Sequence, residues 1–173
     1  MISFTNEPDL PWRTDMKLIL ITALALLALL SQPISSFALD DKLAFSGLTS
    51  TRAIYDVRSN DEKKLQFIFK VIRDTYDGAA QQGVKQSTIV SMRGPTVRLL
   101  VRGRQGDKAL QQETVDLINE IAQRNIRLEA CGYALNLFGV EPEDLYAGVH
   151  AVGNSLNSLV GYQAKGYALV PMN

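Results

Sequence analysis

The stretch Ile126-Arg-Leu-Glu-Ala-Cys-Gly132 alternates apolar and polar residues and then reaches a cysteine that is followed at once by glycine. This pattern predicts a β-strand that ends at residue 131 and turns directly into a loop or a helix. In open α/β sheets, ligands and chemistry collect beyond the carboxyl ends of the strands. Helix N-terminal N–H groups at that edge favour a thiolate over a thiol, so Cys131 is either a reactive group there or a small hydrophobic core residue.

Strands and helices alternate through the rest of the chain. Strands are predicted at 51–57, 87–92, 126–131, 149–152 and 167–170. One helix is expected to begin at the capping-box spacing of Ser59–Glu62 and to end at Gly78, and another to begin at Asp107 and to bury Leu110, Leu117, Ile118 and Ile121. This alternation predicts an α/β fold with a mainly parallel five-stranded sheet and right-handed crossovers.

The first 38 residues have the features of an exported protein. Met16-Lys17 precedes the apolar run Leu18–Leu30, and Ser36-Phe37-Ala38 then offers a small-x-small cleavage site. The sequence is divided into an N-terminal extension and signal peptide at 1–38, a lead-in at 39–50 and one domain at 51–173. A periplasmic or secreted protein is expected; an uncleaved membrane anchor is the alternative, and either Met1 or Met16 can be the start.

Charge and cysteine content exclude several classes of function. The chain has 18 basic and 18 acidic residues, of which 2 and 3 precede residue 39, so the exported part carries a net charge of +1. This mixed, nearly neutral charge argues against nucleic acid as a partner. A single cysteine in an exported chain cannot form an internal disulfide, so Cys131 is a free thiol, an intermolecular bridge or a modified sulfur.

Four stretches in this order resemble the DsrE/DsrF-like family, in its exported single-domain branch. They are Ala53-Ile-Tyr-Asp-Val57 with Lys63-Lys-Leu65, the strand ending in Arg93-Gly94-Pro95, Ile126–Gly132 leading to Gly139–Leu145, and Leu159-Val160 with Gly166–Pro171. The resemblance implies a flavodoxin-like three-layer sandwich that assembles into homotrimers or homohexamers. It also implies a sulfur relay, because some relatives carry sulfur as a persulfide on a cysteine.

The resemblance also indicates the site residues. Cys131 matches the cysteine of the family's Ala-Cys-Gly motif and is the candidate catalytic residue, with Arg93, Gly94 and Gly132 as candidate binding residues. Two positions depart from the family pattern. Tyr133-Ala134 stands where asparagine and threonine are common, and Arg93 stands where histidine is common. A fixed positive charge in place of a proton acceptor suits thiolate stabilisation better than general base catalysis.

Two other functions remain open from the residues. The chain can be a non-enzymatic module that binds a small ligand or a protein, or a structural oligomer with a vestigial pocket. No metal-ligand cluster, phosphate loop, nucleophile elbow or dinucleotide fingerprint is present in the sequence, so we expect neither a metal nor an organic cofactor. Phe138, Leu145 and Tyr146 are expected to be exposed on loops and to meet a partner, either another copy or a protein that gives or takes sulfur.

Export generates the first testable prediction. N-terminal sequencing of the native protein is expected to begin at Leu39 or within a few residues of it, because cleavage follows the small residues before that position. Recovery of the uncleaved chain from the cytoplasmic fraction would contradict the prediction.

Overall fold

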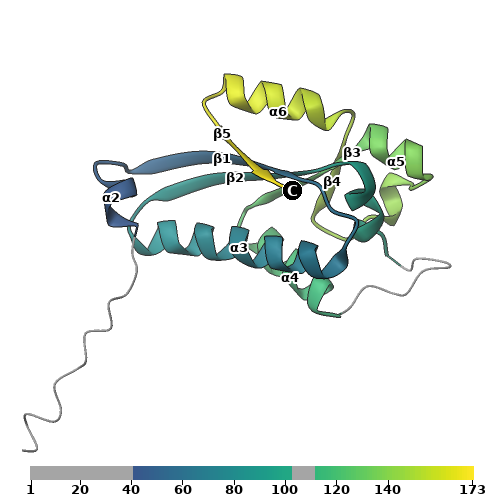
Figure 1. Cartoon of the computed structure of the whole chain (residues 1–173), viewed down its shortest axis with the longest axis horizontal. Helices are drawn as coiled ribbons and strands as arrows, with labels where there is room; N and C mark the ends of the chain where they lie inside the picture. The colour runs from purple at the N-terminus through teal and green to yellow at the C-terminus, as the bar shows by residue number, and fades with distance from the viewer. Residues whose placement is uncertain (1–40, 103–111) are drawn as a thin grey trace, which may run out of the picture. The chain divides into compact units, whose positions relative to one another are not determined.

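The fold is built on one parallel sheet. The computed structural model describes residues 41–102 and 112–173. The five strands are β1 (Ser50–Val57), β2 (Lys85–Met92), β3 (Arg127–Cys131), β4 (Val149–Val152) and β5 (Ala168–Met172). Their order in the sheet is β4-β3-β2-β1-β5, and every neighbouring pair is parallel (Figure 1). The predicted five-stranded parallel α/β sheet is confirmed.

The direction of each connection decides which face of the sheet a helix covers. From β1 to β4 the chain steps across the sheet in one direction, and it then crosses back to place β5 beside β1. Right-handed crossovers therefore put α3 (Glu62–Gln81) and α4 (Gln112–Gln123) on one face and α6 (Ser155–Ala164) on the other, as Figure 1 shows. The result is the three-layer sandwich that the family resemblance implied.

Shorter elements complete the described part of the chain. They are α2 (Lys42–Phe45), the 3-10 helix η1 (Gly94–Leu100), α5 (Gly132–Phe138) and the 3-10 helix η2 (Pro142–Asp144). Two of them, η1 and α5, follow directly from the carboxyl ends of β2 and β3 and pack on each other. None of the helices in the described ranges is long and apolar enough to cross a membrane.

The two faces of the sheet bury very different cores. On the α3/α4 face, alternate strand residues such as Tyr55, Val57 and Val90 join one large apolar cluster with Phe69 and Ile118. On the α6 face, the apolar cluster consists of Ile54, Ile89 and Leu159, with Tyr162 and Tyr167 packed against it. The α3/α4 face therefore supplies most of the hydrophobic stabilisation, and the α6 face has room for polar side chains.

Both predicted ends of the first long helix are wrong. The N-cap of α3 is Asp61, whose Oδ1 accepts a 2.8 Å hydrogen bond from the Lys64 N–H, and Ser59 lies outside the helix. The helix continues through Gly78 to Gln81 because Ala79 is fully buried in the core. The turn is made instead at Gly83, whose φ of +77° is readily adopted only by glycine.

The second long helix is described only from residue 112. Within it, Leu117, Ile118 and Ile121 are buried as predicted. The predicted cap Asp107 and the predicted core residue Leu110 lie outside the described residues.

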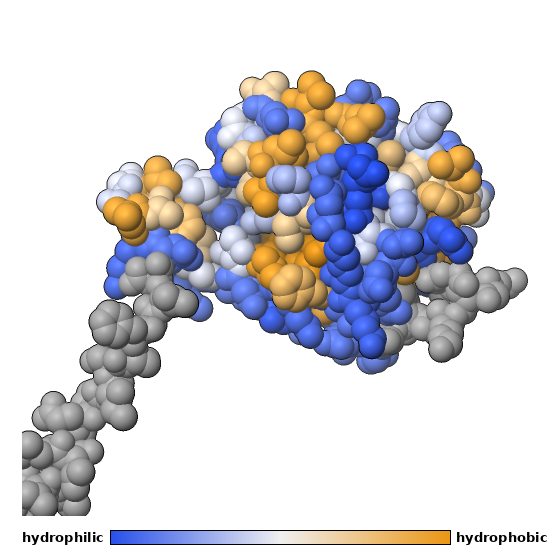
Figure 2. Space-filling view, viewed as in Figure 1, coloured by the Kyte–Doolittle hydropathy of each residue, from blue (hydrophilic) through white to orange (hydrophobic). Residues whose placement is uncertain are grey.

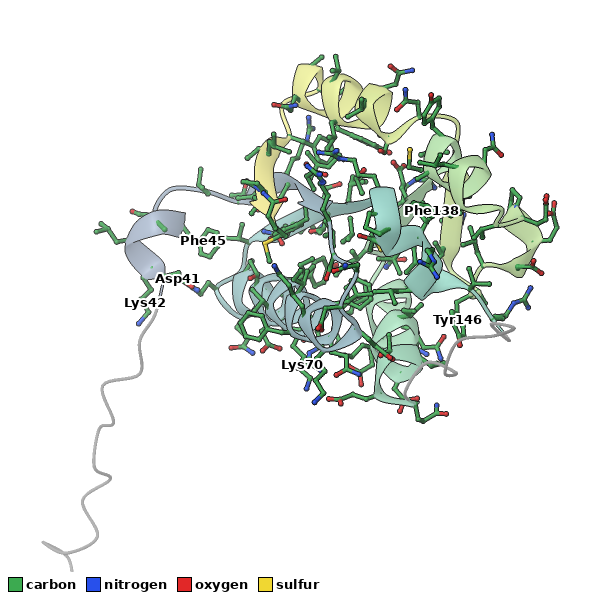
Figure 3. The ribbon with its side chains drawn as sticks, turned by 45° about the vertical axis from the view of Figure 1, so that its right-hand side comes forward. Asp41, Lys42, Phe45, Lys70, Phe138 and Tyr146 are labelled. Atoms are coloured by element: carbon green, nitrogen blue, oxygen red, sulfur yellow. The ribbon has the colours of Figure 1, made fainter. Side chains whose placement is uncertain are left out.

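The predicted exposed cluster at and beyond the end of α5 is only partly correct. Phe138 is exposed, with the Arg98 guanidinium carbon 5.9 Å from its ring centroid, and Tyr146 is partly buried. In Figure 3 these two aromatic residues lie on the side of the fold away from Phe45. Leu145, in contrast, is buried, because its backbone pairs with Val101 and draws the side chain into the main core.

Candidate functional site

Cys131 is the last residue of β3 and the residue before α5. It is 5 % exposed, so the thiol lies beneath the surface at the carboxyl edge of the sheet. The backbone N–H of Ser155, the first residue of α6, donates a hydrogen bond to Cys131 Sγ over 3.5 Å. The thiol therefore lies between the end of β3 and the start of α6, which belongs to the connection from β4 to β5.

Opposing effects act on the pKa of Cys131, and the net result is a lowered pKa. Burial raises it, while donation by the Ser155 hydroxyl, by the Ser155 N–H and by the N–H groups of Ala134 and Tyr133 lowers it. The Ser155 hydroxyl has no partner with full hydrogen-bond geometry among the described residues, but it lies near enough to stabilise the thiolate once its proton turns toward the sulfur. The site therefore favours the nucleophilic form of the cysteine.

Arg93 lies at the same edge, because β2 and β3 are neighbours and Arg93 directly follows β2. Its Nε and Nη2 donate to the two carboxylate oxygens of Asp56 over 2.8 and 2.7 Å. The pKa of Arg93 is raised, chiefly by this hydrogen bonding to Asp56 and in smaller part by the negative charge of the Cys131 thiolate. Arg93 is therefore a fixed cation near the sulfur, oriented by a two-pronged bond that shares its charge with Asp56.

A cavity of about 310 Å³ connects these residues to the surface. Its lining consists of Arg93, Gly94, Cys131, Tyr133, Ala134, Leu137, Asn154, Ser155 and Leu156. Three of the lining residues are strongly exposed: Tyr133 at 73 %, Leu137 at 71 % and Leu156 at 52 %. These three side chains surround the opening of the cavity through which the thiol is reached, and we call them the apolar rim.

The candidate binding residues divide into two groups. Arg93 and Gly94 line the thiol cavity, and Gly94 has a φ of +60° that allows the chain to turn sharply after β2. Gly132 does not line it. A Cβ at Gly132 would lie 2.7 Å from the Val152 carbonyl oxygen, so this glycine allows α5 to start against the end of β4. The close approach of the Val152 carbonyl oxygen makes Gly132 a packing requirement of the site.

Sequence reasoning missed two residues of the site. Asp56 orients Arg93, and Ser155 donates to the sulfur from 24 positions further along the chain. The signal for both was available: Asp56 stands next to the last residue of the first strand, and Ser155 follows the N-cap Asn154 just after the fourth. Carboxyl ends of parallel strands gather at one edge, so both were candidates by position.

A larger hollow of about 630 Å³ lies at the opposite edge of the sheet. Residues at the amino-terminal ends of β1 and β2 line it, among them Thr51, Arg52 and Lys85, together with Tyr76 of α3. It has no thiol and lies away from the carboxyl ends of the strands. In the described ranges, no group of three or more His, Cys, Asp or Glu side chains is placed to hold a metal ion.

Fold and site together define an α/β sandwich with a hydrogen-bonded thiol at the carboxyl edge of its parallel sheet. The chain belongs to the DsrE/DsrF-like family, whose family model matches residues 53–172. This confirms the resemblance seen in the sequence. The family is broadly associated with sulfur relay.

Solved structures support the fold. A protein of unknown function from Methanobacterium thermoautotrophicum, MTH1491, is similar with a TM-score of 0.57 and 21 % identity, covering 70 % of this chain and 98 % of that one. The ychN protein of E. coli is similar with a TM-score of 0.53 and 11 % identity, again covering 70 % and 98 %. A comparison with curated proteins finds no match.

The geometry of the thiol generates the second prediction. Alkylation of native Cys131 by a small reagent is expected to follow a titration whose midpoint lies below the roughly 8.5 of a free cysteine, because hydrogen bonds stabilise the thiolate. Arg93→Ala is expected to raise this midpoint and to slow alkylation at pH 7, since the sulfur loses a nearby cation. Alkylation rate against pH, in the native and variant proteins, is the measurement.

A double variant distinguishes the loss of the Arg93 charge from the effect of an unpaired Asp56 carboxylate on the pKa of the thiol. Asp56→Asn with Arg93→Gln removes both charges and leaves no unpaired carboxylate beside the thiol, so its midpoint should lie between those of the native protein and Arg93→Ala. Cys131→Ser should abolish labelling and keep the fold. Labelling that requires denaturation would show that the thiol is only core packing.

Proposed function

We propose that this protein is exported and carries sulfane sulfur as a persulfide on Cys131 within a sulfur relay. The observation that carries the proposal is the thiol itself: it lies at the carboxyl edge of the sheet, accepts a hydrogen bond from the Ser155 N–H and borders an open cavity. Persulfide exchange needs an accessible, thiolate-prone cysteine and a docking surface, without a second catalytic residue.

The transfer balances without an oxidant or reductant. The Cys131 thiolate attacks the outer sulfur of a donor persulfide, R–S–SH, so that a new S–S bond forms on Cys131 while the donor S–S bond breaks. The donor leaves as a thiolate and takes up the proton that Cys131 released, giving R–SH. The hydrogen bonds that stabilise the Cys131 thiolate make the attack possible near neutral pH. Arg93 is a positive charge close to the sulfur that carries the negative charge before the transfer.

The apolar rim favours a protein as donor or acceptor. Tyr133, Leu137 and Leu156 carry no charge and expose most of their surface around the thiol cavity. Figure 2 shows hydrophobic residues at the surface over α6 and over the α5 end of the fold. A rim of this kind gains more from another protein's apolar segment than from a small charged donor.

Mass spectrometry provides the third prediction. The full chain, purified without reductant after incubation with a sulfane-sulfur donor, is expected to gain about 32 Da on Cys131, the mass of one sulfur atom. High-resolution mass and reversal by a thiol reductant distinguish one sulfur from two oxygens. Cys131→Ser is the control and should gain nothing.

An unmodified thiol under these conditions would contradict the relay. It would favour the alternative in which Cys131 merely lines the pocket of a non-enzymatic binding module.

A Leu137→Ala variant tests the role of the apolar rim when sulfur is delivered by a protein donor. Trimming the rim should weaken that delivery while leaving alkylation by a small reagent unchanged.

We also propose that the protein forms a homo-oligomer, a trimer or a hexamer. The support is α6, which has no charged residue in its ten positions and exposes apolar residues as well as burying them. Leu159 packs inward, while Val160 is exposed on the outer side. A helix without charged residues that exposes large apolar side chains such as Leu156 and Val160 offers a surface for another protein, and another copy of this chain supplies such a cover.

Light scattering tests the oligomer as the fourth prediction. The native protein should have a mass of three or six chains at micromolar concentration. Val160→Glu should lower that mass, because it places a charge in the apolar contact, while Gln163→Glu, an exposed polar position of the same helix, should leave it unchanged. A native mass of one chain would remove the proposal.

A further inference from the structure

The α6 face of the sheet carries positive charge at the amino-terminal ends of its strands. Ile54 and Ile89 lie on this face, and the alternation of side chains along a strand places Arg52 and Lys85 on it as well. Both cations are exposed. The register of β1 and β2 brings them near each other, because Arg52 is the partner of Ser87, which follows Lys85 by two residues.

Hydrogen bonds and ring contacts attach the end of α6 to these two strands. Arg52 Nη1 donates to the carbonyl oxygen of Lys165 over 2.9 Å, and the hydroxyls of Ser87 and Tyr167 are 2.8 Å apart. Lys165 Nζ lies 5.5 Å from the centroid of the Tyr162 ring, and that ring packs edge-to-face on Tyr167 with 5.0 Å between centroids. Lys165 is therefore a third exposed cation at this place.

Arg127 adds a fourth cation from β3. It is the register partner of Ile89 and belongs to the same face. Its Nε donates to Glu129 Oε1 over 2.7 Å, and the same oxygen accepts from the Tyr162 hydroxyl over 3.1 Å. The Arg127 side chain is 44 % exposed and that of Glu129 only 2 %, so the positive end of the pair faces solvent. We call Arg52, Lys85, Arg127 and Lys165 the basic patch.

Exposed negative charge does not balance the basic patch on its own face. The carboxylates that the described strands place on this face are those of Asp56 and Glu129, and each is buried and paired with an arginine. The helix α6 has no charged residue. The face is therefore positive although the whole chain has a net charge of zero, and a surface of one sign attracts a partner of the opposite sign.

The cations of the patch are available to carboxylates. The bond from Arg52 to the Lys165 carbonyl uses Nη1 and leaves Nε and Nη2, a pair of donors that can bind both oxygens of a carboxylate. Within the described ranges, neither Lys85 nor Lys165 forms an ion pair with an acidic side chain. Acidic side chains of a partner can thus bind here without breaking an ion pair of this chain.

The basic patch and the thiol are joined by two elements of the same face. Arg127 precedes Cys131 by four residues, which is about 13 Å along β3. The helix α6 begins at Ser155, beside the sulfur, and ends at its C-cap Lys165, about 15 Å away. Figure 1 shows α6 running from the α5 end of the fold toward the α2 end. A protein that reaches the thiol cavity can therefore contact the patch at the same time.

We propose that the basic patch docks an acidic segment of the protein that exchanges sulfur with Cys131. This inference rests on the proposed function and adds the chemistry of the partner: an apolar surface around its reactive sulfur and acidic residues about 13 to 15 Å from it. The apolar rim supplies the contact at the thiol. The patch speeds association and fixes the orientation of the partner, as complementary charge does at protein interfaces.

An acidic protein segment fits this patch better than a nucleic acid. Proteins that bind single strands stack the bases on open aromatic faces. The tyrosines beside the patch are occupied: Tyr162 and Tyr167 pack on each other and against the apolar cluster of the α6 face, and Lys165 lies by the Tyr162 ring. The patch therefore offers charge without a stacking surface.

The proposed oligomer leaves the patch open. Val160 and Tyr162 are two residues apart on α6, so their side chains point about 200° apart around the helix. Tyr162 points toward β3, where its hydroxyl donates to Glu129. Another copy that covers Val160 therefore approaches from the other side of α6.

Peptide binding to the full chain tests the docking without any sulfur donor. The probe is a fluorescent synthetic peptide with leucines at one end and glutamates at the other, compared with a peptide in which glutamines replace the glutamates. Fluorescence anisotropy should show roughly tenfold tighter binding of the acidic peptide at low ionic strength. The preference should disappear at about 1 M salt, where the Debye length is about 3 Å. Equal binding of the two peptides at low salt would overturn the proposal.

A charge-reversed variant and a matched control locate the effect. Lys85→Glu with Lys165→Glu should abolish the preference for the acidic peptide. Lys63→Glu with Lys64→Glu makes the same change in net charge at exposed positions of α3, on the opposite face of the sheet, and should keep the preference. A control variant that loses it equally would show that the peptide responds only to net charge, which would overturn the patch.

A single-stranded oligonucleotide tests the competing class of partner. The oligonucleotide should bind the native chain more weakly than the acidic peptide does. If it binds more tightly, and Lys85→Glu with Lys165→Glu removes that binding, the patch takes nucleic acid and the proposal is wrong.

The same two peptides separate this inference from the relay when each carries a cysteine persulfide among its leucines. Sulfur should move to Cys131 faster from the acidic peptide, and the Lys85→Glu, Lys165→Glu variant should remove that advantage. Equal transfer rates from the two peptides would overturn the docking alone. Preferential binding of the acidic peptide without any gain of sulfur on Cys131 would overturn the relay alone.

Discussion

The return of the chain from β4 to β5 is the constraint on which the site depends. The earlier connections step across the sheet in one direction and keep α3 and α4 on one face, so the crossing back must put α6 on the other face to remain right-handed. That places the first turn of α6 over the end of β3. The Ser155 N–H reaches the sulfur of Cys131 for this topological reason, although the two residues belong to different connections.

The α6 face combines a small apolar cluster with a row of buried polar residues. In register across the sheet, Asp56, Ser91 and Glu129 lie side by side and are all buried. The two carboxylates are tolerated because Arg93 and Arg127 pair with them. The stability of the domain rests on the opposite face, where the large core is, which leaves this face able to keep polar groups beside the thiol.

Hydrogen-bond donors from elsewhere in the fold compensate for the apolar side chains beside the thiol. Tyr133, Ala134 and Leu137 leave the immediate surroundings of the thiol mainly apolar. The backbone N–H groups of Tyr133 and Ala134 still contribute to lowering the pKa of Cys131, and Ser155 adds side-chain and backbone donors from α6. Thiolate stabilisation in this protein therefore depends on the contact between β3 and α6.

The sequence alone determined the order of elements, the parallel sheet and the thiol at its carboxyl edge. Alternating patterns fix the strands because side chains on a strand point to opposite faces, and Cys131-Gly132 marks where one strand ends. Helix ends were not determined by the sequence. Gly78 predicted the end of α3, but the helix continues to Gln81 because Ala79 is buried in the core. Leu145 was predicted to be exposed, but its backbone pairing with Val101 buries its side chain.

Only the tertiary structure decided which distant residues meet the thiol. Local patterns place Asp56 and Ser155 at the carboxyl ends of strands but carry no information on strand order, so only register and crossover decided that Ser155 reaches Cys131 and that Asp56 pairs with Arg93 beside it. The same holds for Gly132, whose role comes from the carbonyl oxygen of Val152 across the sheet and not from any neighbour in sequence. Contacts between residues far apart in the chain depend on packing, and packing is a property of the whole fold.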